Sequence, residues 1–397
     1  MRQYSPKRLL TYRGVPLWRD ARIIQGVAQV ASAIIVVSFV VFFIGNVLEA
    51  ANRRGLALGF DYLSQEAGFP IAESVIEYHE SDSFLYAFLV GVLNTLKVAL
   101  IGIVLATGLG IVVGVARLSS NWLVRRIAGA YVETFRNVPL LIQLFFWYFG
   151  VFQLLPLVQN SIRWPGPVYL NNRGIFIAWA TPSPTFQAWL LFVLGAILLA
   201  VALRVALTRL QVRTGRSAFS ILVPILALMI VPALGWFLMS DAPLMRDVPI
   251  LGRFNFEGGL RFTPEFSALL TGLVVYTATY IAEIVRAGIQ AVQRGQVESA
   301  LALGLSNMKT LRLVVFPQAL RIIIPPLISQ CFNLTKNSSL AIAIGYPDLF
   351  SIGRIMINQA GRAVPNFLLI MASYLAMSLT FAIIGNIYNR RVRSVES

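Results

Sequence analysis

Long apolar runs separated by short polar segments make up most of this chain. The runs lie near residues 23–48, 84–116, 127–157, 186–207, 219–240, 266–292, 318–346 and 366–388. Each has about 20 residues or more, the length that an α-helix needs to cross the hydrocarbon core of a bilayer. The pattern therefore predicts an all-α polytopic membrane protein with about eight transmembrane helices.

The first apolar run could be a signal peptide or a retained span. It follows a basic segment that contains Arg2, Lys7, Arg8, Arg13, Arg19 and Arg22. The apolar region of a signal peptide has only about 7–15 residues, whereas this run is long enough to cross the membrane. We therefore expect region 1–83 to consist of a basic N-terminal tail, an extra transmembrane helix and an outer loop rich in Asp and Glu.

Composition agrees with membrane insertion and accounts for the basic charge. The 397 residues are 57% hydrophobic and 13% charged, whereas about 25% of residues are charged in soluble domains. The net charge of +16 comes from residues scattered between the apolar runs, so nucleic acid is not an expected partner. An excess of Lys and Arg is usual in cytoplasmic loops. Counting from a cytoplasmic N-terminus places both termini and the segment 296–317 inside the cell.

The sequence offers little of the chemistry that a catalytic or metal site needs. It has one cysteine, Cys331, and one histidine, His79, which excludes an internal disulfide framework and paired-histidine metal motifs. The residues before Lys97, Lys309 and Lys336 are Leu, Met and Thr, where a phosphate-binding loop requires glycine. We therefore predict no catalytic residues, no metal site and no cofactor on this chain, and ATP hydrolysis would require another chain.

The segment 296–317 is polar although it lies between two apolar runs. Its charged residues, with the one that precedes it, are Arg294, Glu298, Lys309 and Arg312. A segment this charged is expected to emerge into water. Residues 296–303 predict a short helix, Gly304 a left-handed end to that helix, and residues 306–308 a second cap and turn. We therefore expect a helix-turn-helix element outside the membrane, although an ordinary charged loop is the simpler alternative.

The spacing within this segment resembles the EAA loop of ABC importer permeases. Glu298, Ala300, Gly304 and Pro317 fall on the positions of that motif, and Ser299 stands where a first Ala is usual. In that family the loop forms a coupling helix that docks into a groove of a separate ATPase subunit. The resemblance therefore implies that Glu298, Ala300, Gly304 and Pro317 couple this chain to an ATPase.

The resemblance extends over two parts of the chain, 84–157 and 264–390. Its further motifs are Tyr131–Gly150, Tyr280–Gly288, Phe316–Arg321 and Lys336–Leu340. They are similar to the polar amino-acid branch of these permeases, the histidine, glutamine and arginine importers. In size the chain resembles the large permease subunits of general L-amino-acid or glutamate/glutamine/aspartate/asparagine importers.

We therefore expect 84–157 and 264–390 to form the first and second parts of a permease core. Region 158–263 is expected to be an insertion with two extra transmembrane helices, and 391–397 a cytoplasmic tail. The insertion could be an interface for a partner, a peripheral brace or an ornament without a specific role.

Polar residues interrupt the seventh apolar run at Asn333, Lys336, Asn337, Ser338 and Ser339. The first three have i, i+3, i+4 spacing and so share one helix face. An ionisable group within a span marks a transport path or a paired site, and a lysine there could receive an amino-acid carboxylate. We therefore predict a substrate path at these five residues. Alternatively, Lys336 pairs with an acid of a partner subunit or extends toward the membrane surface.

Three further features concern how the helices are built and packed. Glu283 with Arg286, and Glu133 with Arg136, are spaced to form structural ion pairs one helical turn apart. Pro139 is expected to bend or restart its helix. The small residues Gly102, Ala106, Gly110 and Gly114 recur every four positions, which favours close helix packing in a membrane.

Taken as a member of the family it resembles, the chain would be a permease subunit of an ATP-driven, binding-protein-dependent importer of polar amino acids. The resemblance implies cytoplasmic ATPase subunits that hold ATP and Mg²⁺, a second homologous permease chain, a periplasmic amino-acid-binding protein and the lipid of a bacterial inner membrane. The chain itself would not be an enzyme. An ion-coupled secondary transporter acting alone is the alternative, but it would be expected to carry intramembrane carboxylates and no docking loop.

Overall fold

A computed structural model describes residues 11–12, 15–16, 21–53, 58–214 and 220–393 of the chain. The basic residues expected in the N-terminal tail before residue 11, and the last four residues of the expected cytoplasmic tail, lie outside the described residues.

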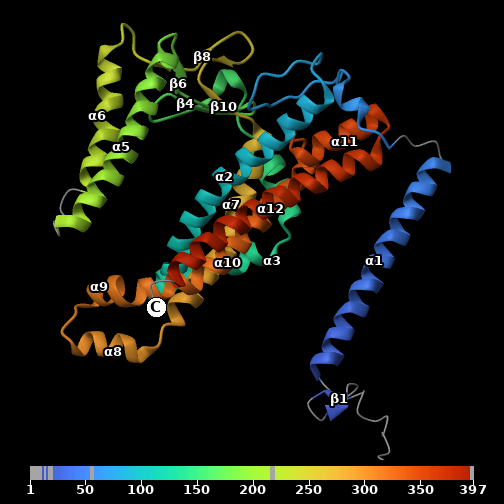
Figure 1. Cartoon of the computed structure of the whole chain (residues 1–397). Coiled ribbons are helices and arrows are strands. Elements are labelled where there is room, and N and C mark those ends of the chain that lie inside the picture. The colour runs from blue at the N-terminus through green and yellow to red at the C-terminus, as the bar shows by residue number, and fades with distance from the viewer. Residues whose placement is uncertain (1–10, 13–14, 17–20, 54–57, 215–219, 394–397) are drawn as a thin grey trace, which may run out of the picture.

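Helices dominate the described chain (Figure 1). The first six α-helices are α1 (Ala21–Arg53), α2 (Phe84–Ala116), α3 (Trp122–Asn137), α4 (Leu140–Phe145), α5 (Phe186–Thr214) and α6 (Leu222–Leu238). The others are α7 (Pro264–Gln290), α8 (Arg294–Ala302), α9 (Asn307–Thr310), α10 (Phe316–Asn337), α11 (Leu349–Ala360) and α12 (Ala363–Arg393). Short 3₁₀ segments are η3 (Asp61–Ser64), η5 (Val158–Asn160) and η7 (Ser338–Ile344), and π-helical turns are η4 (Phe146–Phe152) and η6 (Leu311–Val315).

Six helical segments of the described chain are long and apolar enough to cross a membrane. They are Ile24–Phe43, Phe84–Ala116, Phe186–Gln211, Pro264–Gln290, Asn307–Ile344 and Ala363–Ile387. A bent pair of helices, Trp122–Asn137 and Leu140–Phe152, would make a seventh. The structure therefore confirms a polytopic helical protein, but not the expected eight spans, because the run near 219–240 forms only the shorter helix α6.

The third apolar run is broken rather than straight. Helix α3 ends at Asn137, Val138 is extended, and α4 begins directly after Pro139. Proline disfavours helical geometry in the residue before it and lacks an N–H for the preceding turn. The two halves consequently meet at an angle of 103°, so the prediction that Pro139 bends or restarts the helix is confirmed.

Helices α2 and α7 lie side by side along the centre of the bundle, with α10, α11 and α12 packed around them (Figure 1). Gly102, Ala106, Gly110 and Gly114 of α2 are all buried. A Cβ atom added at Gly110 would lie 2.6 Å from Cβ of Ile281 in α7, and one added at Gly114 would lie 2.8 Å from the Ala282 carbonyl oxygen. The predicted packing role of these small residues is confirmed, since larger ones would force the two helices apart.

Two parts of the chain leave this bundle. The span in α1 has none of its residues buried, and α1 stands apart from the other helices (Figure 1). Helices α5 and α6 form a hairpin of their own, in which the Trp189 ring nitrogen donates to the Pro232 carbonyl oxygen at 2.9 Å. Many of the large apolar side chains of α1, α5 and α6 are exposed.

Short strands flank the α5–α6 hairpin. The hydrophobic pattern did not predict these strands. A four-stranded antiparallel sheet has the order β10 (Leu260–Phe262), β5 (Gly174–Ile177), β4 (Val168–Asn171) and β3 (Ile162–Trp164). Two smaller sheets pair β6 (Trp179–Pro182) with β7 (Leu244–Asp247) and β8 (Ile250–Leu251) with β9 (Phe256–Glu257). Near the N-terminus, β1 (Thr11–Tyr12) pairs with β2 (Val15–Pro16). The chain before α5 therefore pairs with the chain after α6.

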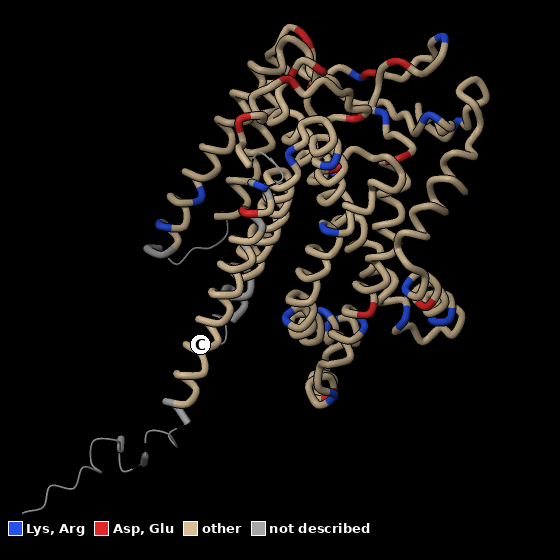
Figure 2. The backbone as a smooth tube through the Cα atoms, turned by 90° about the vertical axis from the view of Figure 1, so that its right-hand side faces the viewer, with Lys and Arg blue, Asp and Glu red and all other residues tan. Residues whose placement is uncertain are grey.

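Charged residues gather at the two ends of the bundle and are sparse between them (Figure 2). This distribution is expected for a protein whose middle lies in hydrocarbon, where an unpaired charge is costly.

The glycine contact between α2 and α7 makes a prediction about stability. Replacing Gly110 with Val should lower the thermal unfolding temperature of the protein in detergent, because overpacking costs about 1–3 kcal/mol. Gly108→Val is the matched control, since a Cβ atom at Gly108 meets nothing within 4 Å. Equal unfolding temperatures for the two variants would show that the close contact does not limit stability.

Candidate functional site

The segment after α7 forms two short helices outside the bundle. Helix α8 is closed by Gly304, whose φ is +81°, and the Leu305 N–H donates to the Ala300 carbonyl oxygen at 3.1 Å. Helix α9 then begins after Ser306. Glycine adopts this left-handed conformation without the steric cost that other residues meet. The expected helix-turn-helix and its left-handed glycine are therefore confirmed as structure.

The four residues expected to couple to an ATPase do not form one cluster. Ala300 is buried, with 4% of its surface exposed, and so anchors α8 in place. Glu298 and Gly304 are exposed, as is Pro317 in the first turn of α10. Between Glu298 and Pro317 the chain exposes six large apolar side chains: Leu301, Leu303, Met308, Leu311, Leu313 and Phe316. We refer to the first four of these side chains as the loop surface.

An ion network lies just before this loop, where α2 and α7 end. The Glu283 carboxylate accepts hydrogen bonds from both Arg286 and Arg117. The predicted Glu283–Arg286 pair is therefore confirmed. The sequence did not reveal Arg117 as a third member, because it is 166 positions away from Glu283.

The predicted pair between Glu133 and Arg136 is wrong. Both residues are described, yet no ion pair joins them within 4.0 Å. The Arg136 guanidinium lies instead over the Tyr280 ring of α7, with 5.5 Å between its carbon and the ring centroid. Such a cation–π contact competes with an exposed i, i+3 ion pair, which contributes little by itself.

Asn333 and Asn337 line a cavity of about 180 Å³ between α10 and α7. Its other lining residues are Tyr276, Thr277, Tyr280 and Gln330, and the two tyrosine hydroxyls are hydrogen-bonded to each other at 2.8 Å. The cavity could hold roughly six water molecules at about 30 Å³ each. Amide and hydroxyl groups thus surround a space that could accept a small polar molecule.

The other three residues of the predicted path lie elsewhere. Lys336 is exposed in the last turn of α10 and does not line the cavity. Ser338 is fully buried and donates to the Thr335 carbonyl oxygen at 2.8 Å, and the Ser339 hydroxyl donates to the Lys336 carbonyl oxygen at 2.8 Å. The two serine hydroxyls therefore satisfy helix carbonyls, and only the two asparagines share one cavity.

A second ion pair ties the outer loop to the bundle, and sequence reasoning missed it. Lys97 of α2 donates to the Glu73 carboxylate at 2.6 Å, and the same carboxylate accepts from the Thr263 hydroxyl at the start of α7. The Lys97 nitrogen also lies 4.4 Å from the Phe266 ring centroid. A lysine within an apolar run was the available signal, because such a group needs a partner. Its partner could not be found from spacing alone.

Asp348 caps α11 close to this pair, between two spans. Its carboxylate accepts from the Ser351 N–H at 2.8 Å and from the Tyr374 hydroxyl at 3.4 Å. The residue is fully buried. Burial raises the pKa of the Asp348 carboxyl from 3.8 to about 6, because a low-dielectric environment disfavours the charged form.

Groups that could hold a metal are absent from the described ranges. No three His, Cys, Asp or Glu side chains lie close enough together there to bind an ion.

Comparison with known proteins gives a family match over most of the chain. Residues 106–394 match the family described as binding-protein-dependent transport system inner membrane component. The permease protein YhdX of Escherichia coli (strain K12) is 44% identical, over 93% of this chain and 94% of that protein. The general L-amino acid transport system permease protein AapQ of Rhizobium johnstonii is 42% identical, over 93% and 92% respectively.

A third relative is the glutamate/glutamine/aspartate/asparagine transport system permease protein BztB of Rhodobacter capsulatus. It is 36% identical over 95% of each chain. Among solved structures, an amino acid ABC transporter with histidines has a TM-score of 0.47 at 21% identity, covering 78% of this chain and 95% of that one. The MetNI methionine ABC transporter has a TM-score of 0.43 at 15% identity, covering 78% and 97%.

The raised pKa of Asp348 predicts how stability changes with pH. The folded state binds this proton more tightly than the unfolded state, so the stabilisation is complete below about pH 4 and is lost as the pH rises through about 6. Asp348→Asn keeps an acceptor for the Ser351 N–H but cannot titrate. The wild type should therefore lose stability relative to the variant between about pH 4 and about pH 6.5, by about 1.4 kcal/mol for each unit of pKa shift, and the difference should stay constant above that range.

Thermal unfolding of both proteins in detergent across this pH range would measure the difference. Parallel curves would mean that Asp348 does not titrate in this range.

Proposed function

Since this chain belongs to the family of binding-protein-dependent transport system inner membrane components, we propose that it forms half of the membrane path of an ATP-driven amino-acid importer. It is a membrane-spanning permease subunit of an ABC importer, a multi-pass protein of the inner membrane. Permeases of this family work with an ATPase and a binding protein. An ion-coupled secondary transporter acting alone is not consistent with membership of this family.

The observation that carries the proposal is the family match over residues 106–394. The relatives YhdX, AapQ and BztB are all permease proteins, and all three names refer to amino-acid transport. We propose amino acids as the substrates on that ground. The chain would not be an enzyme itself, and ATP and Mg²⁺ would be bound by cytoplasmic ATPase subunits. A second, homologous permease chain would supply the other half of the path.

Helices α8 and α9 are proposed to dock on the ATPase. They project beyond the bundle and expose the loop surface, in which Leu303 has 83% and Met308 71% of its surface exposed. Exposed apolar patches on folded proteins mark interaction sites. Glu298 stands beside this surface on α8 and would form its charged rim, as rims of protein interfaces are polar.

The charge distribution supports an orientation in which the loop and both termini are cytoplasmic. Arg117, Arg125, Arg126 and Arg286 lie at the end of the bundle that carries α8. The outer loop 58–83 at the other end contains six acidic residues and no Lys or Arg. Lys and Arg are enriched on the cytoplasmic side of membrane proteins.

The cavity between α7 and α10 is proposed to lie on the substrate path. Its amides and tyrosine hydroxyls could bind the ammonium and carboxylate groups of an amino acid. Lys336 follows Asn333 by one helical turn and would supply a positive charge near the cavity, with Ser338 and Ser339 holding the end of α10. The residues that line the cavity are themselves uncharged, so the positive charge would have to come from Lys336 beside it.

Replacing Gly304 with Val should weaken coupling of ATP hydrolysis to transport. A β-branched residue at φ +81° costs about 1–2 kcal/mol, so the docking-competent turn should become roughly 5- to 30-fold less populated. Gly295→Val is the matched control in the same loop, because its backbone is not left-handed and a Cβ atom there also meets nothing within 4 Å. Substrate-stimulated ATP hydrolysis of the reconstituted complex would be measured, together with Glu298→Ala.

Normal stimulation in both Gly304→Val and Glu298→Ala would contradict the coupling assignment.

Single cysteines at Ser64 and Gln296, in a Cys331→Ala background, provide the test of orientation. A membrane-impermeant maleimide should label them from opposite sides, and labelling from one side would exclude the proposed topology.

Replacing Lys336 with Met tests the path. The substitution keeps the length of the side chain and removes its charge. Loss of a charge-assisted hydrogen bond, about 1.5–3 kcal/mol, should lower uptake at low substrate concentration roughly 10- to 100-fold. Binding of substrate to the isolated binding protein should not change, because that site is on another chain.

Lys336→Arg is the control for this experiment, since it keeps the charge but changes the geometry. Partial uptake with Arg and none with Met would support a cation that receives carboxylate. Wild-type uptake with Met would remove Lys336 from the path, and failure of the Met variant to assemble would identify a structural residue.

A further inference from the structure

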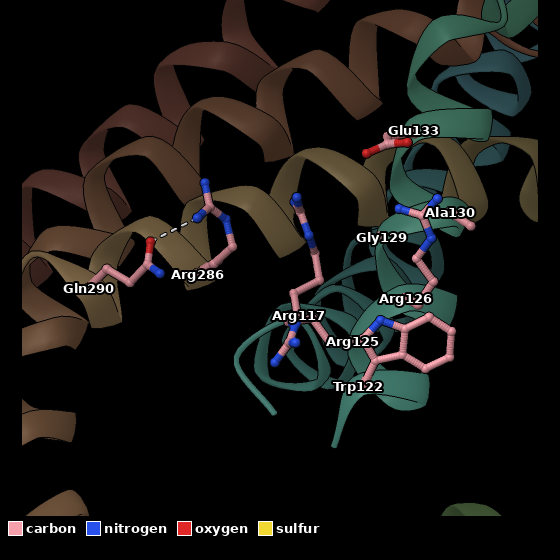
Figure 3. Close-up of a pocket in the computed structure, with 9 residues that line it drawn as sticks. All are labelled: Arg117, Trp122, Arg125, Arg126, Gly129, Ala130, Glu133, Arg286 and Gln290. Atoms are coloured by element: carbon pink, nitrogen blue, oxygen red, sulfur yellow. Dashed lines mark hydrogen bonds between the residues drawn. The ribbon is translucent and has the colours of Figure 1, made fainter. Parts of the chain in front are cut away.

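An arginine-lined cavity lies between the α2–α3 turn and α7, outside the path discussed above (Figure 3). Its volume is about 490 Å³. The charged and aromatic residues that line it are Arg117, Trp122, Arg125, Arg126, Glu133 and Arg286. Because α7 ends four residues before α8 begins, the cavity lies at the end of the bundle that carries the α8–α9 loop.

Positive charge exceeds negative charge in this cavity. Four guanidinium groups face one lining carboxylate, that of Glu133, and Glu283 nearby already accepts from Arg117 and Arg286. Arg125 donates to the Ser119 carbonyl oxygen at 3.0 Å. Within the described chain, neither Arg125 nor Arg126 has a carboxylate within 4.0 Å. Arg125 and Arg126 are therefore available for an anion. A guanidinium group can donate two parallel hydrogen bonds to two oxygens of one phosphate group.

Apolar side chains stand beside these arginines on the first turns of α3. Trp122, Leu123 and Ile127 have 66%, 56% and 62% of their surface exposed. Only five residues separate the end of α2 from the start of α3, and the opposite face of α3 is buried through Ala128 and Val132. Trp with Arg at the end of a span is typical of the water–lipid interface.

We propose that this cavity binds the phosphate group of an anionic phospholipid, with the acyl chains against Trp122, Leu123 and Ile127. The shared chemistry is a phosphate anion, and free phosphate could also meet the arginines. The lipid is favoured because free phosphate would leave the three apolar side chains without a partner. Basic pockets between helices on the cytoplasmic side are suited to such headgroups. A bound lipid would connect the α2–α3 turn with the last turn of α7, next to α8.

The proposal can be tested by lipid binding, without any transport assay. The purified complex would be reconstituted in bilayers of phosphatidylcholine alone or of equal parts phosphatidylcholine and phosphatidylglycerol. Bound phosphatidylglycerol would be counted by native mass spectrometry, and its affinity measured by titration. The double variant Arg125→Gln, Arg126→Gln should bind it about 10- to 100-fold more weakly than wild type. Arg163→Gln, Arg253→Gln removes two exposed charges from the insertion and should change nothing.

Two further arms separate the lipid from free phosphate. Trp122→Ala should weaken phosphatidylglycerol binding with the arginines intact, and it serves as the test if the double variant is unstable. Inorganic phosphate added to phosphatidylcholine bilayers should not raise the unfolding temperature. Equal lipid binding by wild type and both cavity variants would overturn the proposal. A rise in unfolding temperature with phosphate alone, lost in the double variant, would also overturn it by assigning the site to the free anion.

Discussion

The contact between α2 and α7 is the element on which the remaining structure depends. Small residues let the two helices meet without an intervening layer of side chains, as at Gly110. Charged groups fasten both ends of the contact, through Lys97 with Glu73 at one end and Arg117 with Glu283 at the other. A bilayer offers no water to an unpaired charge. Each pair therefore holds together segments that are far apart in the sequence. Helices α10 and α11 pack against the α2–α7 contact, and α12 packs against α10 and α11.

Helix α7 connects every part of the molecule to which we assign a role. Its first turn, at Thr263, receives the outer loop through Glu73, and its middle supplies Tyr276 and Tyr280 to the cavity. Its last turns carry Glu283 beside the arginine-lined cavity and then lead into α8. A force on α8 would thus act on one continuous helix. Coupling by a rigid element of this kind requires no chain of side-chain movements.

The sequence predicted features that depend on neighbouring residues. Apolar runs located the candidate spans, except that the run near 219–240 forms only the shorter helix α6. Gly304 predicted its turn, and i, i+3 spacing predicted the Glu283–Arg286 pair. Predictions from residue spacing failed where a residue distant in the sequence competes for the same partner. The Arg136 guanidinium, for example, lies over the Tyr280 ring and does not pair with Glu133. The partners of Lys97 and Arg117 could not be predicted from spacing either, because only tertiary packing brings these residues together. The short strands were missed because each has only two to four residues, too few to show a clear alternation of apolar and polar positions.

The segment that carries the α5–α6 hairpin leaves and rejoins the bundle through paired strands. Strand β5, before the α5–α6 hairpin, pairs directly with β10, which leads into α7, so Ile177 lies opposite Leu260. Because the chain before α5 and the chain after α6 meet as hydrogen-bonded strands, the hairpin between them does not change the spacing of the helices on either side. The hairpin is therefore a peripheral element attached to the bundle through paired strands. We propose that, in evolution, such an element could be lengthened or lost while the helical bundle kept its geometry.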